Sequence, residues 1–263
     1  MNKLKLLILV FASFLIFSFV ANDYRFVSNG SFKPGESYDY KVKYGFLTIG
    51  AADVDVDEKI YSLNGRPCYK VNVQGRTAGL TDMFKVRNTY RSYVDTLAFI
   101  PHKFIYSARE KSYKRDQIIN FDQTHNEAVK YEKDESKKFD VPNNIQDVIS
   151  GYYFLRTVDF SKFGIGHTIS TPLFFDEELY QMKVRYNGKG TVDTKFGKIK
   201  VLKLNPILPK NDLFSGENAI RVWVSDDENR VPIKIEVDFS FGTIDMELKN
   251  YKGVKYPFRW YKG

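Results

Sequence analysis

The chain has 263 residues, 43% of them hydrophobic and 16% aromatic, and its formal net charge at pH 7 is +8. This length and composition are enough for one large core, and the 18 Tyr and 22 Phe favour strands over helices. Basic and acidic residues are interleaved, which disfavours nucleic-acid binding and allows only a weak attraction to anionic lipid or glycan surfaces. Cys68 is the single cysteine, so an intramolecular disulfide is excluded. It lies far from the apolar run of residues 6–20, which also excludes a lipid-modified N-terminal cysteine.

Residues 1–21 resemble a secretory signal peptide. Lys3 and Lys5 form a short basic region, and an almost unbroken apolar run follows that is too short for a typical spanning helix. Cleavage after Ala21 suits this pattern, but Phe19 is bulky where a small residue is usual, so an uncleaved anchor stays open. We favour cleavage and a periplasmic location.

An irregular N-terminal arm is predicted at residues 22–35, followed by a single β-rich domain at residues 36–263. Apolar and polar residues alternate through most of this domain, which places one face of each strand in a core and the other in water. In the last hairpin we expect an inward set of Ile233, Ile235, Val237, Ile244, Met246 and Leu248, and an outward set of Lys234, Glu236, Asp245 and Glu247.

Short polar and glycine-containing segments between the strands predict hairpin turns. They are Asn64-Gly65, Gly188-Lys189-Gly190, Phe196-Gly197-Lys198, Asp226-Asp227-Glu228-Asn229 and Phe241-Gly242. Consecutive hairpins indicate an antiparallel meander. The expected fold is mostly β: one large antiparallel, strongly curved sheet or partial barrel with a single central helix.

That helix is predicted at about residues 145–158, because Ile145, Val148, Ile149 and Tyr152 have the spacing of one helical face. Its expected start is a capping box formed by Asn143 with Gln146, or by Asn144 with Asp147. The helix would separate two β-rich halves of the chain.

No motif marks the chain as an enzyme, and we predict no catalytic residue, metal or cofactor. The three histidines, His102, His125 and His167, have no close ligand spacing. Asp53, Asp55 and Asp57 resemble the start of a calcium loop, but the positions that require Gly and Glu hold Glu58 and Asn64. Strand alternation explains this triplet better.

Three residues are candidates for ligand contact. Arg156 lies on the apolar stripe of the helix with Tyr152, and a buried Arg needs a partner. We favour a structural ion pair with a carboxylate on a strand, and the alternative is an anion anchor at the mouth of a sheet cavity. Trp260 belongs to the aromatic tail Tyr256–Tyr261, which either closes one end of the core or contacts a partner or glycan.

Three segments resemble an exported bacterial family of unknown function, numbered 3108 among such domains. They are Tyr38–Gly50, Gln146–Arg156, and Val222–Asp227 with Arg230–Ile235. The resemblance implies an exported β-rich domain of the Gram-negative envelope and brings no catalytic residues. The closing hairpin is also similar to that of open-barrel periplasmic lipoprotein carriers, a likeness of fold only.

From these observations we expect a non-catalytic periplasmic binding or accessory protein. Its curved sheet would hold a lipid, an acyl chain or a lipoprotein segment in an apolar cavity, with peripheral contacts to the envelope. The alternative is a structural or glycan-contacting envelope module, and an enzyme is the third hypothesis. Ligand identity and oligomeric state stay open at this point.

Overall fold

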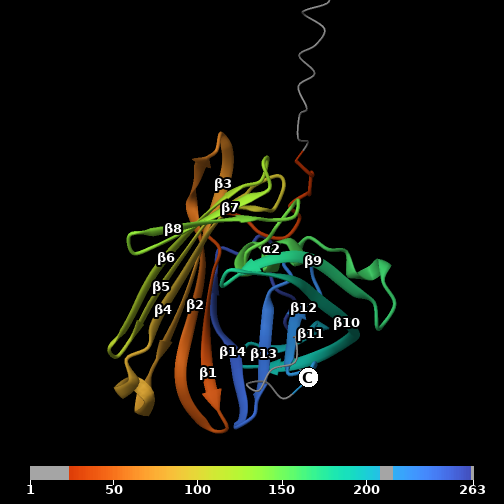
Figure 1. Ribbon diagram of the computed structural model, residues 1–263. Coiled ribbons are helices and arrows are strands. Elements are labelled where there is room, and N and C mark those ends of the chain that lie inside the picture. The colour runs from red at the N-terminus through yellow and green to blue at the C-terminus, as the bar shows by residue number, and fades with distance from the viewer. Residues whose placement is uncertain (1–23, 208–215, 262–263) are drawn as a thin grey trace, which may run out of the picture.

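The computed structural model describes residues 24–207 and 216–261 (Figure 1). The predicted signal peptide and its cleavage site lie outside these residues. The elements are β1 (Ser37–Tyr44), β2 (Leu47–Leu63), β3 (Arg66–Thr77), η1 (Gly79–Phe84), β4 (Arg87–Asp95), β5 (Pro101–Glu110), β6 (Tyr113–Asp122), β7 (Glu127–Glu132), β8 (Glu135–Asp140), α2 (Val148–Arg156), η2 (Phe160–Lys162), β9 (Thr168–Phe175), β10 (Glu178–Thr194), β11 (Gly197–Ile207), β12 (Ile220–Ser225), β13 (Pro232–Phe239) and β14 (Gly242–Lys252).

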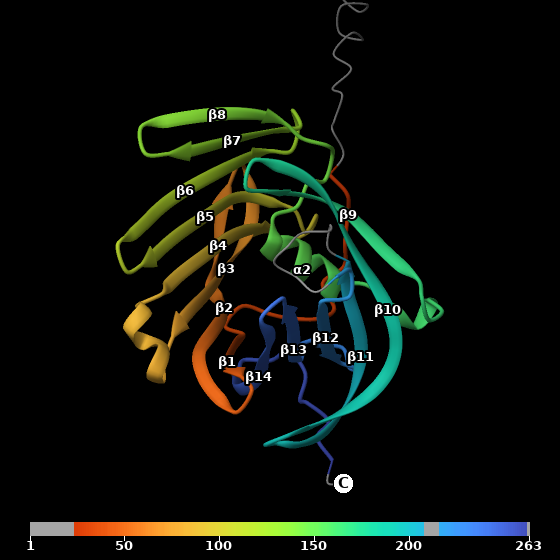
Figure 2. The same cartoon turned by 60° about the horizontal axis from the view of Figure 1, so that its bottom comes forward.

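The strands form one antiparallel sheet in the order β8-β7-β6-β5-β4-β3-β2-β1-β14-β13-β12-β11-β10-β9. Each strand therefore pairs with its neighbours in the chain, except that β14 returns to pair with β1 and the chain crosses from β8 to β9 through α2. The sheet curves around α2, which lies on its concave side (Figure 2). The predicted fold is confirmed: a strongly curved, open sheet with a single α-helix among the described residues.

The two edge strands of the open sheet are β8 and β9, and we call the gap between these two edges the seam. Ion pairs cross it from the β9–β10 turn: Glu177 contacts Lys130 and Lys137, and Asp176 contacts Arg115 at 3.3 Å. These ion pairs hold the two edges of the sheet together, although β8 and β9 do not pair through their backbones.

The helix begins three residues later than predicted, at Val148. The backbone of Gln146 instead forms a β-bridge with β9. Its N–H donates to Pro172 O at 3.0 Å, and its C=O accepts from the Phe174 N–H at 2.8 Å. The predicted Asn143 and Asn144 caps are therefore wrong. Asp147 is the cap, and Ser150 completes the capping box with it.

The cap carboxylate gives a pH-dependent contribution to stability. Asp147 is 1% exposed, and burial raises its pKa to about 6, although hydrogen bonds from Ser92 and Ser150 oppose the rise. Because the pKa is higher in the folded chain, this contribution is fully present below about pH 4 and is lost as pH rises through about 6.

The reference for this effect is Asp147→Asn, which keeps a capping side chain but does not titrate. Between pH 4 and 6 we expect the unfolding free energy of wild type to fall by up to about 3 kcal/mol relative to that of the variant. Urea denaturation at several pH values measures this, with Asp159→Asn, at the exposed cap of η2, as the control. A difference between wild type and Asp147→Asn that does not change with pH would contradict the assignment.

The described part of the N-terminal arm, from Tyr24 to Glu36, has no helix or strand, and it packs into the core. Phe32 is 1% exposed and lies edge-on to the rings of Phe99 and Tyr153. Arg25 donates to Ala98 O and Phe99 O at 2.7 and 2.8 Å. The arm therefore packs between the sheet and α2 and contacts both.

Four of the five predicted turns join consecutive strands, at or within one residue of the expected positions. The fifth expectation is wrong: Gly188-Lys189-Gly190 lies inside β10, where the register with β11 shifts between Tyr186 and Lys189. An extra residue there makes a β-bulge, which accounts for the glycines without ending the strand.

Candidate functional site

An apolar cavity of about 350 Å³ lies between α2 and the concave face of the sheet. Its wall is almost entirely carbon. The lining residues come from β1–β4, α2, β13 and β14 and are Tyr38, Tyr40, Ala52, Val54, Val73, Tyr90, Val148, Ile149, Tyr152, Tyr153, Pro232, Ile235 and Met246. Period-two alternation places these strand residues on one face, with one extra residue of β13 between Pro232 and Ile235. The helical spacing of 148, 149, 152 and 153 turns α2 toward them.

The five tyrosines of this wall contribute rings rather than hydroxyl groups. The Tyr40 hydroxyl donates to Pro232 O at 3.0 Å, and the buried hydroxyls of Tyr152 and Tyr153 have no hydrogen-bond partner among the described residues. Burial accordingly raises the pKa of Tyr40 and Tyr153 well above the ordinary value. The cavity surface therefore favours an apolar chain and offers almost nothing to a polar group.

Tyr152, the first of the predicted candidates, lies in the walls of two cavities. The second has about 150 Å³ and lies between α2 and β10–β12, where Leu155, Met182 and Val222 are among its lining residues. Tyr152 thus stands where the helix divides the concave interior into two apolar compartments.

Arg156, the second candidate, is 2% exposed and makes the predicted ion pair. Its partner is Glu36, which directly precedes β1: Nη1 contacts Oε1, and Nη2 donates to Oε2 at 3.0 Å. Nε and Nη2 also donate to Asn229 O at 3.0 and 2.8 Å. Burial alone would lower the pKa of Arg156, but the surrounding groups, Glu36 foremost, together outweigh it and hold the pKa well above its usual range.

This geometry ties two distant parts of the chain, the segment before β1 and Asn229, to the end of α2. Ser31, in the arm, donates from Oγ to the Arg156 carbonyl at 2.6 Å, and its own backbone carbonyl accepts from Nη2 at 3.3 Å. The guanidinium also lies 5.0 Å from the centre of the Phe32 ring. With its donors used by protein atoms, Arg156 has little left to offer a bound anion.

Trp260, the third candidate, packs in an aromatic cluster at the end of the chain. Its indole N–H donates to the Tyr251 hydroxyl at 3.0 Å, and its ring lies 5.1 Å from those of Phe196 and Phe258. Tyr261 pairs with Lys198 through two backbone hydrogen bonds of 2.9 and 3.0 Å. The tail therefore covers the start of β11.

The predicted inward residues of the last hairpin are buried or line the apolar cavity at four positions. Ile235 and Met246 line the cavity. Ile233 and Leu248 are 1% and 4% exposed, and Leu248 pairs with the cavity residue Tyr40. The predicted outward residues Lys234 and Glu247 line a second hollow, which Ile233 and Leu248 also border. The pairing with β12 shifts between Trp223 and Val224, which places one extra residue in β13 between Pro232 and Lys234.

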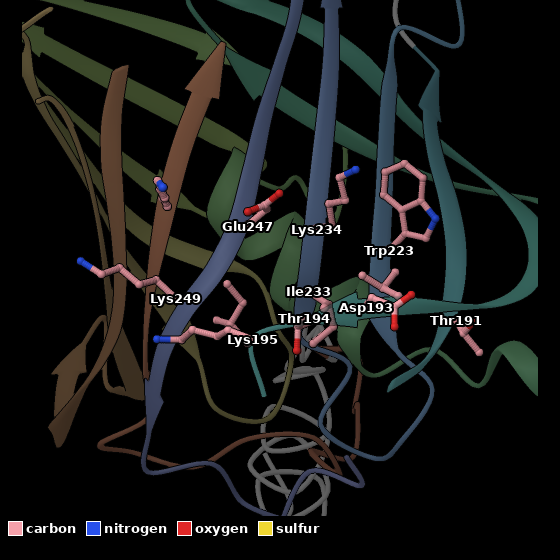
Figure 3. Close-up of a pocket in the computed structure, with 12 residues that line it drawn as sticks. Thr191, Asp193, Thr194, Lys195, Trp223, Ile233, Lys234, Glu247 and Lys249 are labelled. Atoms are coloured by element: carbon pink, nitrogen blue, oxygen red, sulfur yellow. The ribbon is translucent and has the colours of Figure 1, made fainter. Parts of the chain in front are cut away.

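This outer hollow has about 760 Å³ and lies on the opposite face of β1, β12, β13 and β14 from the apolar cavity (Figure 3). Trp223 and Lys234 lie side by side, with the Lys234 Nζ 5.4 Å from the indole centre. The end of β10 supplies Thr191, Asp193 and Thr194. Its wall mixes apolar and polar atoms and includes four lysines: Lys41, Lys195, Lys234 and Lys249.

The remaining titratable residues singled out in the sequence do not gather. His102 is buried and contacts Asp95 at 3.2 Å, whereas His125 is exposed beside Asp122 at 2.7 Å. His167 stacks on Phe163. Among the described residues no three His, Cys, Asp or Glu side chains are grouped as metal ligands.

The sequence pattern did not identify the cavity itself or Glu36. Alternation marks which strand residues face inward, but it carries no information on whether the space between them is filled. Glu36 lies 120 positions before Arg156, so only the folded chain brings them together.

Within the described ranges, no helix has the length and apolar character needed to cross a membrane.

A family model described as "Protein of unknown function (DUF3108)" matches residues 39–249. No curated protein shows significant similarity. A solved β-barrel-like protein of the domain of unknown function DUF1849, from Brucella abortus, is 10% identical, with a TM-score of 0.55 over 86% of this chain and 100% of that one. This likeness concerns the fold alone.

Two further solved structures are more distant. A candidate lipoprotein from Parabacteroides distasonis is 10% identical, with a TM-score of 0.30 over 87% of this chain and 100% of that one. A candidate exported protein with a YmcC-like fold from Bacteroides fragilis is 11% identical, with a TM-score of 0.32 over 86% and 99%.

Proposed function

Because the chain belongs to the family described as Protein of unknown function (DUF3108), which brings no activity with it, we propose a function from the geometry alone. The protein is a non-catalytic binding protein that holds an acyl chain, from a lipid or a lipoprotein, in the apolar cavity beneath α2. The observation that carries this proposal is the almost purely carbon wall of a cavity of about 350 Å³.

The size and chemistry of the cavity both support an apolar chain. Its volume lies within the range of about 300–1,000 Å³ that is common for ligand pockets. Each methylene group that leaves water contributes roughly 0.8 kcal/mol. Because the surface of the wall is almost entirely carbon, this term is the main source of affinity.

A fluorescent fatty-acid probe tests the proposal. We expect wild type to bind it and Val73→Trp to bind it at least tenfold more weakly, because an indole at this cavity-lining position fills the space that the chain needs. Gln74→Trp is the matched control, since it adds the same ring at the next residue of β3, which is exposed and on the opposite face.

If wild type leaves the probe in solution, or if both Trp variants bind it as tightly as wild type does, the chain is not held in this cavity. Circular dichroism of each variant shows whether its fold is intact.

The proposed location is the periplasm, reached through a cleaved signal peptide. This rests on the basic and apolar pattern of residues 1–21. N-terminal sequencing of protein from a periplasmic fraction is expected to begin near Asn22, and intact Met1 in a membrane fraction would contradict it.

A second candidate function rests on the outer hollow. Trp223 offers an indole, and Thr191 and Thr194 offer hydroxyl groups. The four lysines of the hollow outnumber its two carboxylates, Asp193 and Glu247, so the set suits an anionic envelope glycan. Under this hypothesis Trp223→Ala weakens binding to such a glycan and leaves the fatty-acid probe unaffected. Glycan binding that survives Trp223→Ala would rule this hollow out.

A further inference from the structure

A small hollow of about 220 Å³ lies at the seam of the sheet, between β4–β6 and the β9–β10 turn; we call it the vestibule. Its lining residues are Tyr90, Phe104, Tyr106, Arg115, Gln117, Ile119, Phe174, Phe175 and Asp176. Tyr90 also lines the apolar cavity, so the two spaces share a wall. A chain held in the apolar cavity reaches the vestibule when its end group passes the Tyr90 ring.

The apolar cavity presents an almost purely carbon wall, whereas the wall of the vestibule includes a buried side-chain amide without a partner. Gln117 is 4% exposed, and its Nε2 has no hydrogen-bond partner among the described residues. An amide carries two donors and an acceptor, and rotation about its last bond exchanges the two ends at little cost. Leaving such a group unpaired costs stability that a ligand with a matching group restores.

The charged groups around the vestibule pair with one another. Arg115 donates from Nε to Glu132 at 2.9 Å and contacts Asp176 at 3.3 Å. Lys130 and Lys137 both contact Glu177. Three cations therefore meet three carboxylates, and no surplus positive charge is left to attract an anionic head group.

From these contacts we infer that the ligand of the cavity is an amphiphile with a neutral oxygen-bearing end, an ester or an alcohol, and that Gln117 hydrogen-bonds this end in the vestibule. This inference rests on the proposed function, because the apolar cavity must hold the chain. Gln117 is then the residue that sets specificity for the head group, while the carbon wall sets affinity for the chain.

The test compares three competitors of equal chain length: hexadecane, methyl palmitate and palmitate. Each displaces the fluorescent fatty-acid probe from the full mature protein. One hydrogen bond corresponds to about a 3- to 10-fold gain. We expect methyl palmitate to bind about that much more tightly than hexadecane, and palmitate to gain nothing over the ester.

In Gln117→Met, the preference for the ester over hexadecane is expected to fall to about one, with hexadecane affinity unchanged. Gln74→Met, on the outer face of β3, retains the preference. If the Met variant does not fold, Gln117→Leu replaces it, because a leucine side chain has no donor and therefore also loses the ester preference.

Equal binding of ester and hexadecane by wild type overturns the inference and leaves the proposed function standing. An ester preference that persists in Gln117→Met overturns it as well. Failure of all three competitors and of the probe to bind overturns the proposed function itself.

Discussion

Arg156→Leu is expected to lower the free energy of unfolding by about 3–5 kcal/mol, or to prevent folding, because it leaves the Glu36 carboxylate buried without a partner. Both side chains are almost inaccessible, at 1% and 0% exposed, so water cannot replace the lost contacts. Chemical denaturation of wild type and variant measures the loss.

Two comparisons separate the ion pair from other effects of this substitution. Glu36→Leu with Arg156→Leu removes both charges, so the double variant should recover part of the stability that Arg156→Leu loses. Arg109→Leu removes an exposed partner of Asp116 and should cost about 1 kcal/mol or less. If Arg156→Leu is as stable as wild type but loses a bound anion, Arg156 is a ligand anchor.

Ile199→Ala is expected to cost about 2–5 kcal/mol of unfolding free energy, whereas Ile235→Ala should cost clearly less, under about 2 kcal/mol. Both residues lie in strands, but Ile199 is 2% exposed within a packed core, and Ile235 lines the apolar cavity. Truncation at Ile199 creates a new void, while truncation at Ile235 enlarges a space that already exists.

The same pair has a binding readout. Ile235→Ala should alter the affinity for the fluorescent fatty-acid probe, and Ile199→Ala should not, provided that the variant remains folded at the assay temperature. Equal losses of stability at the two positions, with no probe binding by wild type, would mean that Ile235 belongs to an ordinary core. A structural envelope module would then be the better description.

The sheet could be predicted because its signal is local. A residue such as Ile235 between Lys234 and Glu236 fixes a strand and its two faces, and four turn signals fix the meander. The pattern fails where glycines mark a bulge rather than a turn, as at Gly188-Lys189-Gly190, and where backbone pairing with a distant strand overrides helical spacing, as at Gln146. Neither event can be recognised within a window of a few residues.

The candidate site could be predicted only in part, for a similar reason. Arg156 is visible because a charge interrupts an apolar stripe, and such a residue requires a partner wherever it is buried. Glu36 and Gln117 are ordinary polar residues in the sequence, and their burial depends on the arm and on the β9–β10 turn. Empty space depends on the sum of all side-chain volumes and is fixed only in the folded chain.

Native mass spectrometry of the gently extracted mature protein, before and after addition of methyl palmitate, tests the central claim most directly. The account predicts one amphiphile bound to each wild-type chain and none bound to Val73→Trp, with Gln74→Trp behaving as wild type. Wild type that carries no amphiphile in either sample, or the same adduct on Val73→Trp as on wild type, would contradict a chain held in the cavity beneath α2.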